Sequence, residues 1–203
     1  MSARELELKA VVERPADLVA RIEARGATRA FRGRMSDRRY DLPDRPFEAR
    51  DEVLRVRSFV PSAGSPARPA EVAWKGPTRQ SGGYKEREEL EFTVQDAGAV
   101  EALLGRLGFT VSDAIDRCVA YYRLGAAVLR LEWYPRMDVL LEVEGAPAAI
   151  EEAVAATGLA RAAFTPERLL DFAARYARRT GSAPALNVAA TGGSGAAWPD
   201  WAP

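Results

Sequence analysis

Charged residues recur at every second position in several segments of this sequence. Glu5, Glu7 and Lys9 alternate with Leu6 and Leu8. Because successive side chains of a β-strand point to opposite faces, each such segment would place its charges on one face. Carboxylates bind divalent cations, and basic side chains bind phosphate groups, so the pattern indicates a site for both. The same alternation is found at Arg55 and Arg57, at Lys85, Arg87, Glu89 and Glu91, and at Glu142 and Glu144.

The composition limits the classes of function. The chain has 203 residues, of which 47% are hydrophobic and 29% charged, as expected for one globular domain. Its 29 basic and 29 acidic residues balance, which argues against a nucleic-acid partner or an anionic membrane. The absence of histidine excludes histidine-based catalysis and histidine-bound zinc, so any metal must have oxygen ligands. The single cysteine, Cys118, excludes an intramolecular disulfide. Without an apolar leader or spanning run, we expect a cytoplasmic protein.

Hydrophobic periodicity and turn residues predict eight strands and four helices. The turns at Gly82-Gly83, Gly125 and Pro135 indicate antiparallel hairpins. Thr165 and Pro166 predict the start of the last helix. From Gly181 the sequence is nearly uncharged and rich in Gly, Ala, Ser and Pro, so we expect a domain over 1–180 and a disordered tail over 181–203. The expected strands are 3–13, 35–42, 52–60, 71–75, 84–94, 115–124, 126–134 and 138–144, and the expected helices are 15–25, 97–107, 147–157 and 166–179.

Eight antiparallel strands close readily into a barrel. If the apolar faces of the strands filled this barrel, the helices would have no surface on which to bury their apolar stripes. We therefore predict an α+β fold dominated by antiparallel β-structure. It is a closed eight-stranded barrel, a tunnel with a charged lumen, and its helices pack outside.

The ordinary alternative is that these charges are solvated, which is the usual arrangement for any one pair. Their number, however, favours a wet lumen with a phosphate-binding side and a metal-binding side. The basic side would contain Arg55, Arg57, Lys75, Lys85, Arg87, Arg117 and Arg130. The acidic side would contain Glu5, Glu7, Glu89, Glu91, Glu132, Glu142 and Glu144. A polyphosphate bound with a divalent metal would use both.

Several motifs resemble those of the CYTH superfamily, also called the triphosphate tunnel metalloenzymes. They are Glu5-x-Glu7-x-Lys9, Asp37 with Tyr40-Asp41, Leu54-Arg55-Val56-Arg57, Trp74-Lys75-Gly76-Pro77, the charged run from Tyr84 to Glu91, and Glu142-x-Glu144. The resemblance covers about residues 3–180, and the stretch 84–92 is most similar to the class IV adenylyl cyclase branch. The family also includes thiamine triphosphatases and inorganic triphosphatases. It implies an eight-stranded tunnel with outer helices.

The resemblance also implies roles for the charged residues. Substrate phosphates would be bound by Lys9, Arg55, Arg57, Lys75, Lys85, Arg87, Arg117 and Arg130, with Lys9, Arg57, Lys85 and Arg87 the catalytic cations. One or two Mg²⁺ or Mn²⁺ ions would be bound by Glu5, Glu7, Glu132, Glu142 and Glu144, joined by Glu89 or Glu91. Two positions depart from the family pattern. Val119 replaces a second basic residue two positions after Arg117, and Asp138 replaces a glycine before the last acidic pair.

Three functions remain open at the level of sequence. The first is a metal-dependent enzyme that converts ATP to cyclic AMP and pyrophosphate, or hydrolyses ATP, tripolyphosphate or thiamine triphosphate. The second is a non-catalytic polyphosphate- or nucleotide-binding module, which Val119 favours. The third is a structural domain with solvated charges. No nucleic-acid or membrane partner is expected, and the protein would be a monomer or a homodimer.

Overall fold

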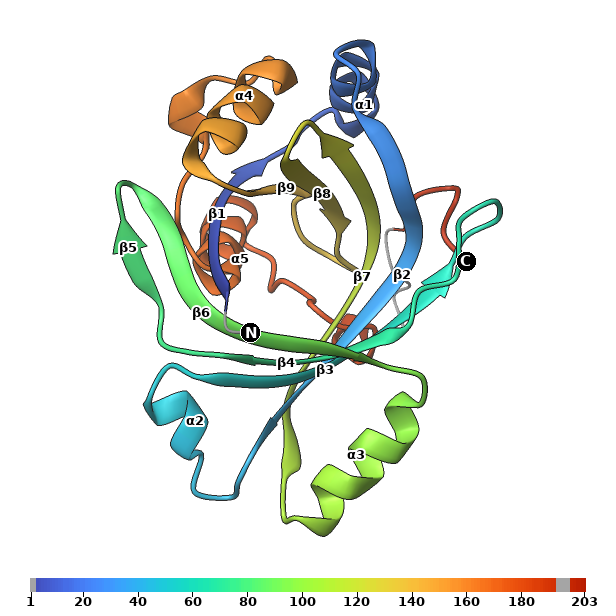
Figure 1. Ribbon diagram of the computed structural model, residues 1–203, viewed down its shortest axis with the longest axis vertical. Coiled ribbons are helices and arrows are strands. Elements are labelled where there is room, and N and C mark those ends of the chain that lie inside the picture. The colour runs from blue at the N-terminus through green and yellow to red at the C-terminus, as the bar shows by residue number, and fades with distance from the viewer. Residues whose placement is uncertain (1–2, 193–197) are drawn as a thin grey trace.

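The strands form a closed antiparallel barrel, as predicted (Figure 1). The computed structural model describes residues 3–192 and 198–203, with side chains from Leu6 onward. Eight strands follow one another around the barrel in the order β1-β9-β8-β7-β2-β3-β4-β6, and pairing of β1 with β6 closes it. The short β5 pairs with the beginning of β6. The strands are β1 (Ala3–Val11), β2 (Thr28–Asp41), β3 (Val53–Pro61), β4 (Ala70–Lys75), β5 (Arg79–Ser81), β6 (Tyr84–Val94), β7 (Thr110–Leu124), β8 (Ala127–Trp133) and β9 (Leu140–Glu144).

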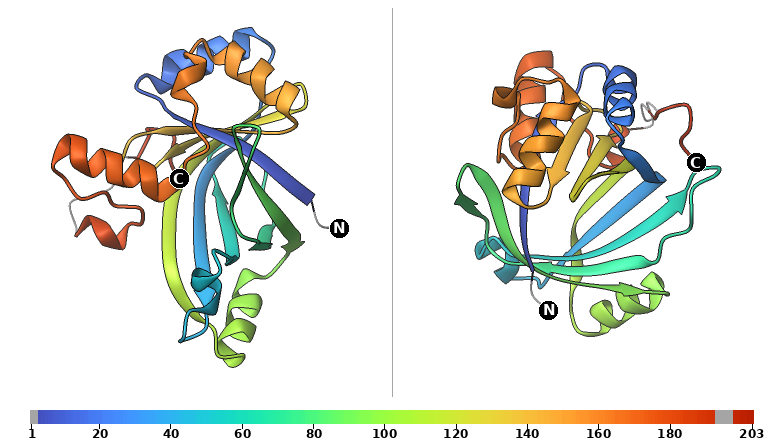
Figure 2. Two further views of the ribbon diagram at one scale, coloured as in Figure 1. Left: turned by 90° about the vertical axis from the view of Figure 1, so that its left-hand side faces the viewer. Right: turned by 45° about the horizontal axis from the view of Figure 1, so that its top comes forward.

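The helices lie outside the barrel and cover apolar faces of the strands (Figure 2). Leu8, Leu131 and Leu141 point outward and are fully buried in the largest core cluster, which also contains Leu18 and Ile150 from the helices. Burial of each such leucine stabilises the fold by about 1.5–3 kcal/mol. The prediction of an apolar outer wall is therefore confirmed. The helices are α1 (Pro15–Ala24), α2 (Pro46–Ala49), α3 (Ala97–Arg106), α4 (Pro147–Thr157) and α5 (Leu169–Thr180), with 3₁₀ turns η1 (Arg161–Ala163) and η2 (Ala189–Thr191).

The two predicted hairpins at glycine have the expected form. Gly82 and Gly83 both have positive φ, at 58° and 85°, and join Ser81 to its partner Tyr84. Positive φ at both central residues is the requirement of the turn that matches strand twist. Gly125, with φ of 57°, occupies the tight turn between β7 and β8.

Several element boundaries differ from the prediction. β2 begins at Thr28 and β7 at Thr110, because the two strands pair with each other over most of their length. The helix α5 begins at Leu169 and not at Pro166, since the backbone of Thr165 exchanges two hydrogen bonds with Lys9 and is extended. β5 and the single turn α2 were not predicted. None of the helices within 3–192 and 198–203 is long and apolar enough to cross a bilayer.

Residues 183–191 of the expected tail make contacts with the barrel. Ala185 pairs with Arg136 and is fully buried, and the carbonyl of Leu186 accepts a hydrogen bond of 2.8 Å from the backbone of Asp116. Further along, the ring of Trp201 packs edge-on against Trp133 with centroids 5.2 Å apart. Residues 193–197 of the predicted tail lie outside the described residues. The tail is thus attached to the outside of the barrel at both of its described parts.

Candidate functional site

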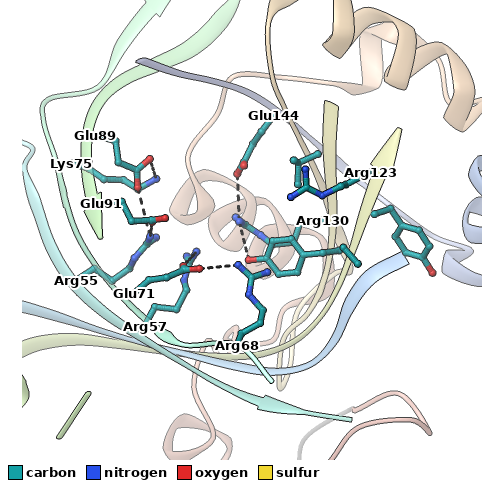
Figure 3. Close-up of a pocket in the computed structure, with 14 residues that line it drawn as sticks. Arg55, Arg57, Arg68, Glu71, Lys75, Glu89, Glu91, Arg123, Arg130 and Glu144 are labelled. Carbon is teal, nitrogen blue, oxygen red and sulfur yellow. Dashed lines mark hydrogen bonds and ion pairs between the residues drawn. The ribbon is translucent and has the colours of Figure 1, made fainter. Parts of the chain in front are cut away.

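The barrel contains two charged cavities that meet inside it. The larger has a volume of about 590 Å³ and the smaller about 340 Å³. Four residues line both cavities, namely Arg55, Arg57, Lys75 and Arg130, and all four are cationic. We call these four residues the waist of the tunnel. Figure 3 shows them around the smaller cavity, with Arg55, Arg57 and Lys75 facing Arg130 across the open space.

All eight predicted phosphate ligands line the larger cavity. They project from six strands, and in each case the alternation of the strand places the charge inside while its neighbours face outward. Lys9, Arg55, Arg57, Arg117 and Arg130 are buried. The barrel thus brings the predicted cations together, although they lie as far apart in the sequence as β1 and β8.

Asp37 of β2 organises three of these cations. It is 2% exposed and accepts hydrogen bonds of 2.7 and 3.1 Å from Arg57 and 2.9 Å from Arg117, and Arg55 lies 4.0 Å away. Burial alone would raise the pKa of Asp37, but the three guanidinium groups lower it well below its usual value. From the sequence, Asp37 is expected only as part of a family motif, with no role in the site. Asp37 lies directly opposite Arg57 in the pairing of β2 with β3. This position could have revealed its role, but it can be recognised only when the register of the two strands is known.

Three carboxylates near the waist could hold a metal ion. Glu7, Glu142 and Glu144 each offer an oxygen, and these oxygens lie within 4.8 Å of one another. Lys9 contacts both Glu7 and Glu142, Lys85 lies 2.6 Å from Glu7, and Arg130 contacts Glu142 and lies 3.4 Å from Glu144.

Opposite charges perturb the pKa values in this group. Burial would lower the pKa of Lys9, but Glu142, Glu7 and Glu132 raise it above its usual value. Burial would raise the pKa of Glu142, but Arg130 and Lys9 lower it well below its usual value. Both residues are therefore charged at neutral pH.

The remaining predicted metal ligands lie elsewhere. Glu132 is 2.9 Å from both Arg117 and Arg130 and accepts a hydrogen bond of 2.6 Å from Tyr134. Glu89 and Glu91 face the waist from β6, at 3.7 and 3.3 Å from Arg55. Glu5 pairs through its backbone with Arg87, and its side chain lies outside the described residues.

The prediction that cations and carboxylates occupy separate sides of the lumen is wrong. Lys9, Lys85, Arg117 and each residue of the waist all lie within ion-pair distance of a carboxylate. Mixing of the two signs is required physically, because isolated buried charges would be far more costly than paired ones.

Some donors of the cluster nevertheless lack a hydrogen-bond partner. Within the described part of the chain, Arg117 Nη1 and Arg55 Nε are buried and make no hydrogen bond. Buried polar groups are almost always paired in folded proteins, and an unpaired N–H is costly. Both arginines line the larger cavity, so part of their hydrogen-bonding capacity is not used by the protein's own side chains.

Arg87 has a different environment from the other predicted ligands. Its Nε donates to the carbonyl of Gly76 over 2.6 Å, and its Nη2 donates to the carbonyl of Asp51. The guanidinium group thus connects β6 to two loops at the mouth of the larger cavity. This indicates a structural contribution in addition to any contact with a ligand.

Both departures from the family pattern have a structural setting. Val119 points into the lumen and is fully buried against Phe31, Met35 and Tyr121. An apolar cluster therefore occupies the part of the tunnel where a second basic residue would stand. Asp138 forms a surface ion pair with Arg179 of α5, which attaches the β8–β9 turn to that helix.

The match to a family model decides the relationship. Residues 3–159 match the CYTH domain. The chain belongs to the CYTH domain family. No curated protein matches the sequence. The resemblance noted in the motifs is thereby confirmed.

Solved structures share this CYTH fold at low sequence identity. A protein from Vibrio parahaemolyticus, described as a candidate adenylate cyclase, superimposes with a TM-score of 0.69 and 17% identity, covering 83% of this chain and 96% of its own. A Pyrococcus horikoshii protein gives a TM-score of 0.64 and 23% identity, covering 83% and 98%. A Hippeastrum protein, described as a candidate adenylyl cyclase with a dominant triphosphatase activity, gives 0.58 and 16%, covering 92% and 99%. At these identities the likeness establishes the fold.

Proposed function

We propose that this CYTH protein binds the triphosphate group of a small molecule in its tunnel and hydrolyses it with the help of a divalent metal ion. The observation that carries the proposal is the waist, where every residue shared by the two cavities is a cation. A chain of phosphates that passes from one cavity to the other must run between these four side chains. Arg55 and Arg117 line the larger cavity, and their guanidinium groups are suited to bind its oxygens.

The carboxylates present fit a hard divalent cation. Glu7, Glu142 and Glu144 provide oxygen ligands close together beside the waist, as Mg²⁺ or Mn²⁺ requires. When bound there, such an ion would neutralise charge on the phosphates and lower the pKa of a coordinated water. We assign Glu132, Glu89 and Glu91 to the orientation of arginine and lysine side chains, because each of them contacts cations of the tunnel and none belongs to the close group of three carboxylates.

The protein's own side chains hold the phosphates and stabilise the charge that develops on them. Arg57 and Arg117 are fixed by Asp37, so their remaining N–H groups are oriented before a ligand enters. Lys9 and Arg130 form ion pairs with the candidate metal ligand Glu142 and line the same cavity, where they can donate to phosphate oxygens. The geometry needs no covalent nucleophile. The similarity in fold to a protein with triphosphatase activity supports hydrolysis as the reaction.

Product analysis with defined substrates tests the proposal. The protein is incubated with Mg²⁺ or Mn²⁺ and with ATP, tripolyphosphate or thiamine triphosphate, and the products are resolved by chromatography. Release of inorganic phosphate that stops with excess chelator supports hydrolysis. Cyclic AMP with pyrophosphate would instead identify a cyclase.

Two variants control the experiment. Arg57→Ala should lose activity, whereas Arg179→Ala, on the outer surface, should keep it. Tight binding of tripolyphosphate without turnover would identify a non-catalytic module. If the protein neither binds nor converts any of these substrates, the proposal is refuted.

A further inference from the structure

Arg68 reaches the tunnel from a loop and not from a barrel strand. It belongs to the segment 62–69 between β3 and β4, which is attached to β2 through hydrogen bonds of 3.0 Å between Ser62 and Arg32 and between Arg32 and Ser65. Pro69 follows directly and restricts the backbone of Arg68 to extended conformations. The guanidinium group lines the smaller cavity together with the waist (Figure 3).

Three aromatic rings hold this guanidinium group in place. It lies 4.5 Å from the ring centroid of Phe59, 4.7 Å from that of Tyr121 and 5.5 Å from that of Phe31. Attraction between a cation and aromatic faces stabilises such an arrangement. The rings belong to the apolar cluster around Val119, so this cluster fixes the position of a cation at the edge of the tunnel.

Glu71 connects Arg68 to the waist. One of its carboxylate oxygens lies 2.8 Å from Arg68 Nη2, and the other lies 3.5 Å from Arg57 Nη1. The first distance is that of a strong hydrogen bond, and the second is longer than a hydrogen bond. Arg57 already uses Nε and Nη2 to bind Asp37, so Nη1 is the edge it can offer to a phosphate. A small shift of Glu71 toward Arg57 would occupy that edge.

We propose that Arg68 is a positioning residue that holds Glu71 away from Arg57 and so keeps Arg57 available for the phosphate chain. This inference rests on the proposed function. Arg68 then acts on ligand affinity through Glu71, without contact to the ligand. Without Arg68, the buried Glu71 would turn to Arg57 as its remaining close cation, and the phosphates would have to displace it.

A double-mutant cycle on tripolyphosphate binding tests the inference. Affinity is measured by calorimetry with Mg²⁺ for the wild type, Arg68→Gln, Glu71→Gln and the double variant. We expect Arg68→Gln to weaken binding about tenfold, the effect of one charge-assisted contact, and Glu71→Gln to bind at least as tightly as the wild type. In the Glu71→Gln background, loss of Arg68 should change affinity by less than about threefold. Restored affinity in the double variant cannot arise from a merely structural role of Arg68.

The outcomes separate this inference from the proposed function. An equal loss in both backgrounds would mean that Arg68 contacts the ligand itself, and no loss in either would mean that Glu71 does not compete for Arg57. Either result overturns the inference and leaves triphosphate binding intact. If the wild type fails to bind tripolyphosphate, the proposed function falls and the inference with it. Arg179→Ala, which removes an arginine from the outer surface, is the control and should bind as the wild type does. Melting curves confirm that each variant is folded.

Discussion

Replacement of Asp37 by asparagine should be among the most destabilising changes in the tunnel. Asp37 is 2% exposed and is the shared partner of Arg55, Arg57 and Arg117. An asparagine at this position would keep the shape of the side chain but remove the negative charge that three buried guanidinium groups share. Breaking a buried ion pair in this way costs about 3–5 kcal/mol. For a domain of this size that corresponds to a fall in melting temperature of about 6–20 °C.

Urea unfolding of Asp37→Asn beside Asp138→Asn measures this cost. Asp138 pairs with Arg179 on the surface, where the arginine side chain is 61% exposed, so its loss should cost about 1 kcal/mol or less. Saturating tripolyphosphate should stabilise Asp37→Asn more than the wild type, because the ligand supplies anionic charge to arginines that have lost their partner.

The pH dependence gives a second measurement of the same effect. The folded protein lowers the pKa of Asp37, so its contribution to stability is complete above the unfolded value of about 4 and is lost as the pH falls below it. The difference in stability between the wild type and Asp37→Asn should therefore shrink on acidification below about pH 4. A difference smaller than about 1 kcal/mol at neutral pH, or one that grows in acid, would refute the view that Asp37 organises the arginines.

Three further predictions concern the charged lumen and its outer wall. Glu7→Gln should abolish turnover. Leu8→Ala should lose about 2–5 kcal/mol of unfolding free energy while its folded fraction stays active, because Leu8 is buried under the helices. Unfolding curves and turnover, measured together for both variants, check this contrast. Arg87→Ala should lose about 1–3 kcal/mol of unfolding free energy in urea, since Arg87 donates to two backbone carbonyls. It should weaken tripolyphosphate binding less than Arg57→Ala does, and the reverse order of affinities would contradict this. Excess chelator should abolish turnover, and Mg²⁺ or Mn²⁺ should restore it; full activity in chelator would rule out the metal site.

The alternation of charges predicted the barrel and its inner face correctly, because the side-chain period of a strand is local in sequence. Lys9 and Leu8 could be assigned to opposite faces from their neighbours alone. The pairing of opposite charges was not predicted, because it depends on register. Glu142 stands opposite Lys9 on one side and Arg130 on the other, and Asp37 stands opposite Arg57. Lys9 meets Glu142 only when the distant strands β1 and β9 pair, and the other two partners depend on the register of β8 with β9 and of β2 with β3.

The tail shows a second reason why sequence is insufficient. Its low content of charge and of large apolar residues is typical of disorder. Its attachment to the barrel, however, uses backbone groups, such as the hydrogen bond from Asp116 to the carbonyl of Leu186, and any residue can supply these. Composition does not report such contacts. The sequence likewise does not predict a role for Arg68, because only the fold brings its loop beside Phe31 and Tyr121.

The pairing of charges in the lumen has a consequence for how ligands bind. A triphosphate that takes Nη1 of Arg57 or the N–H groups of Arg130 must compete with Glu71, Glu142 and Glu144. A carboxylate that loses its cation inside the barrel would be left with an uncompensated charge, which is costly at this depth. A divalent cation held by Glu142 and Glu144 would remove that cost, because it would replace Arg130 as the partner of these carboxylates and leave Arg130 available to the phosphates. Under the proposed function, the mixed network would therefore favour entry of metal and triphosphate together over entry of either alone.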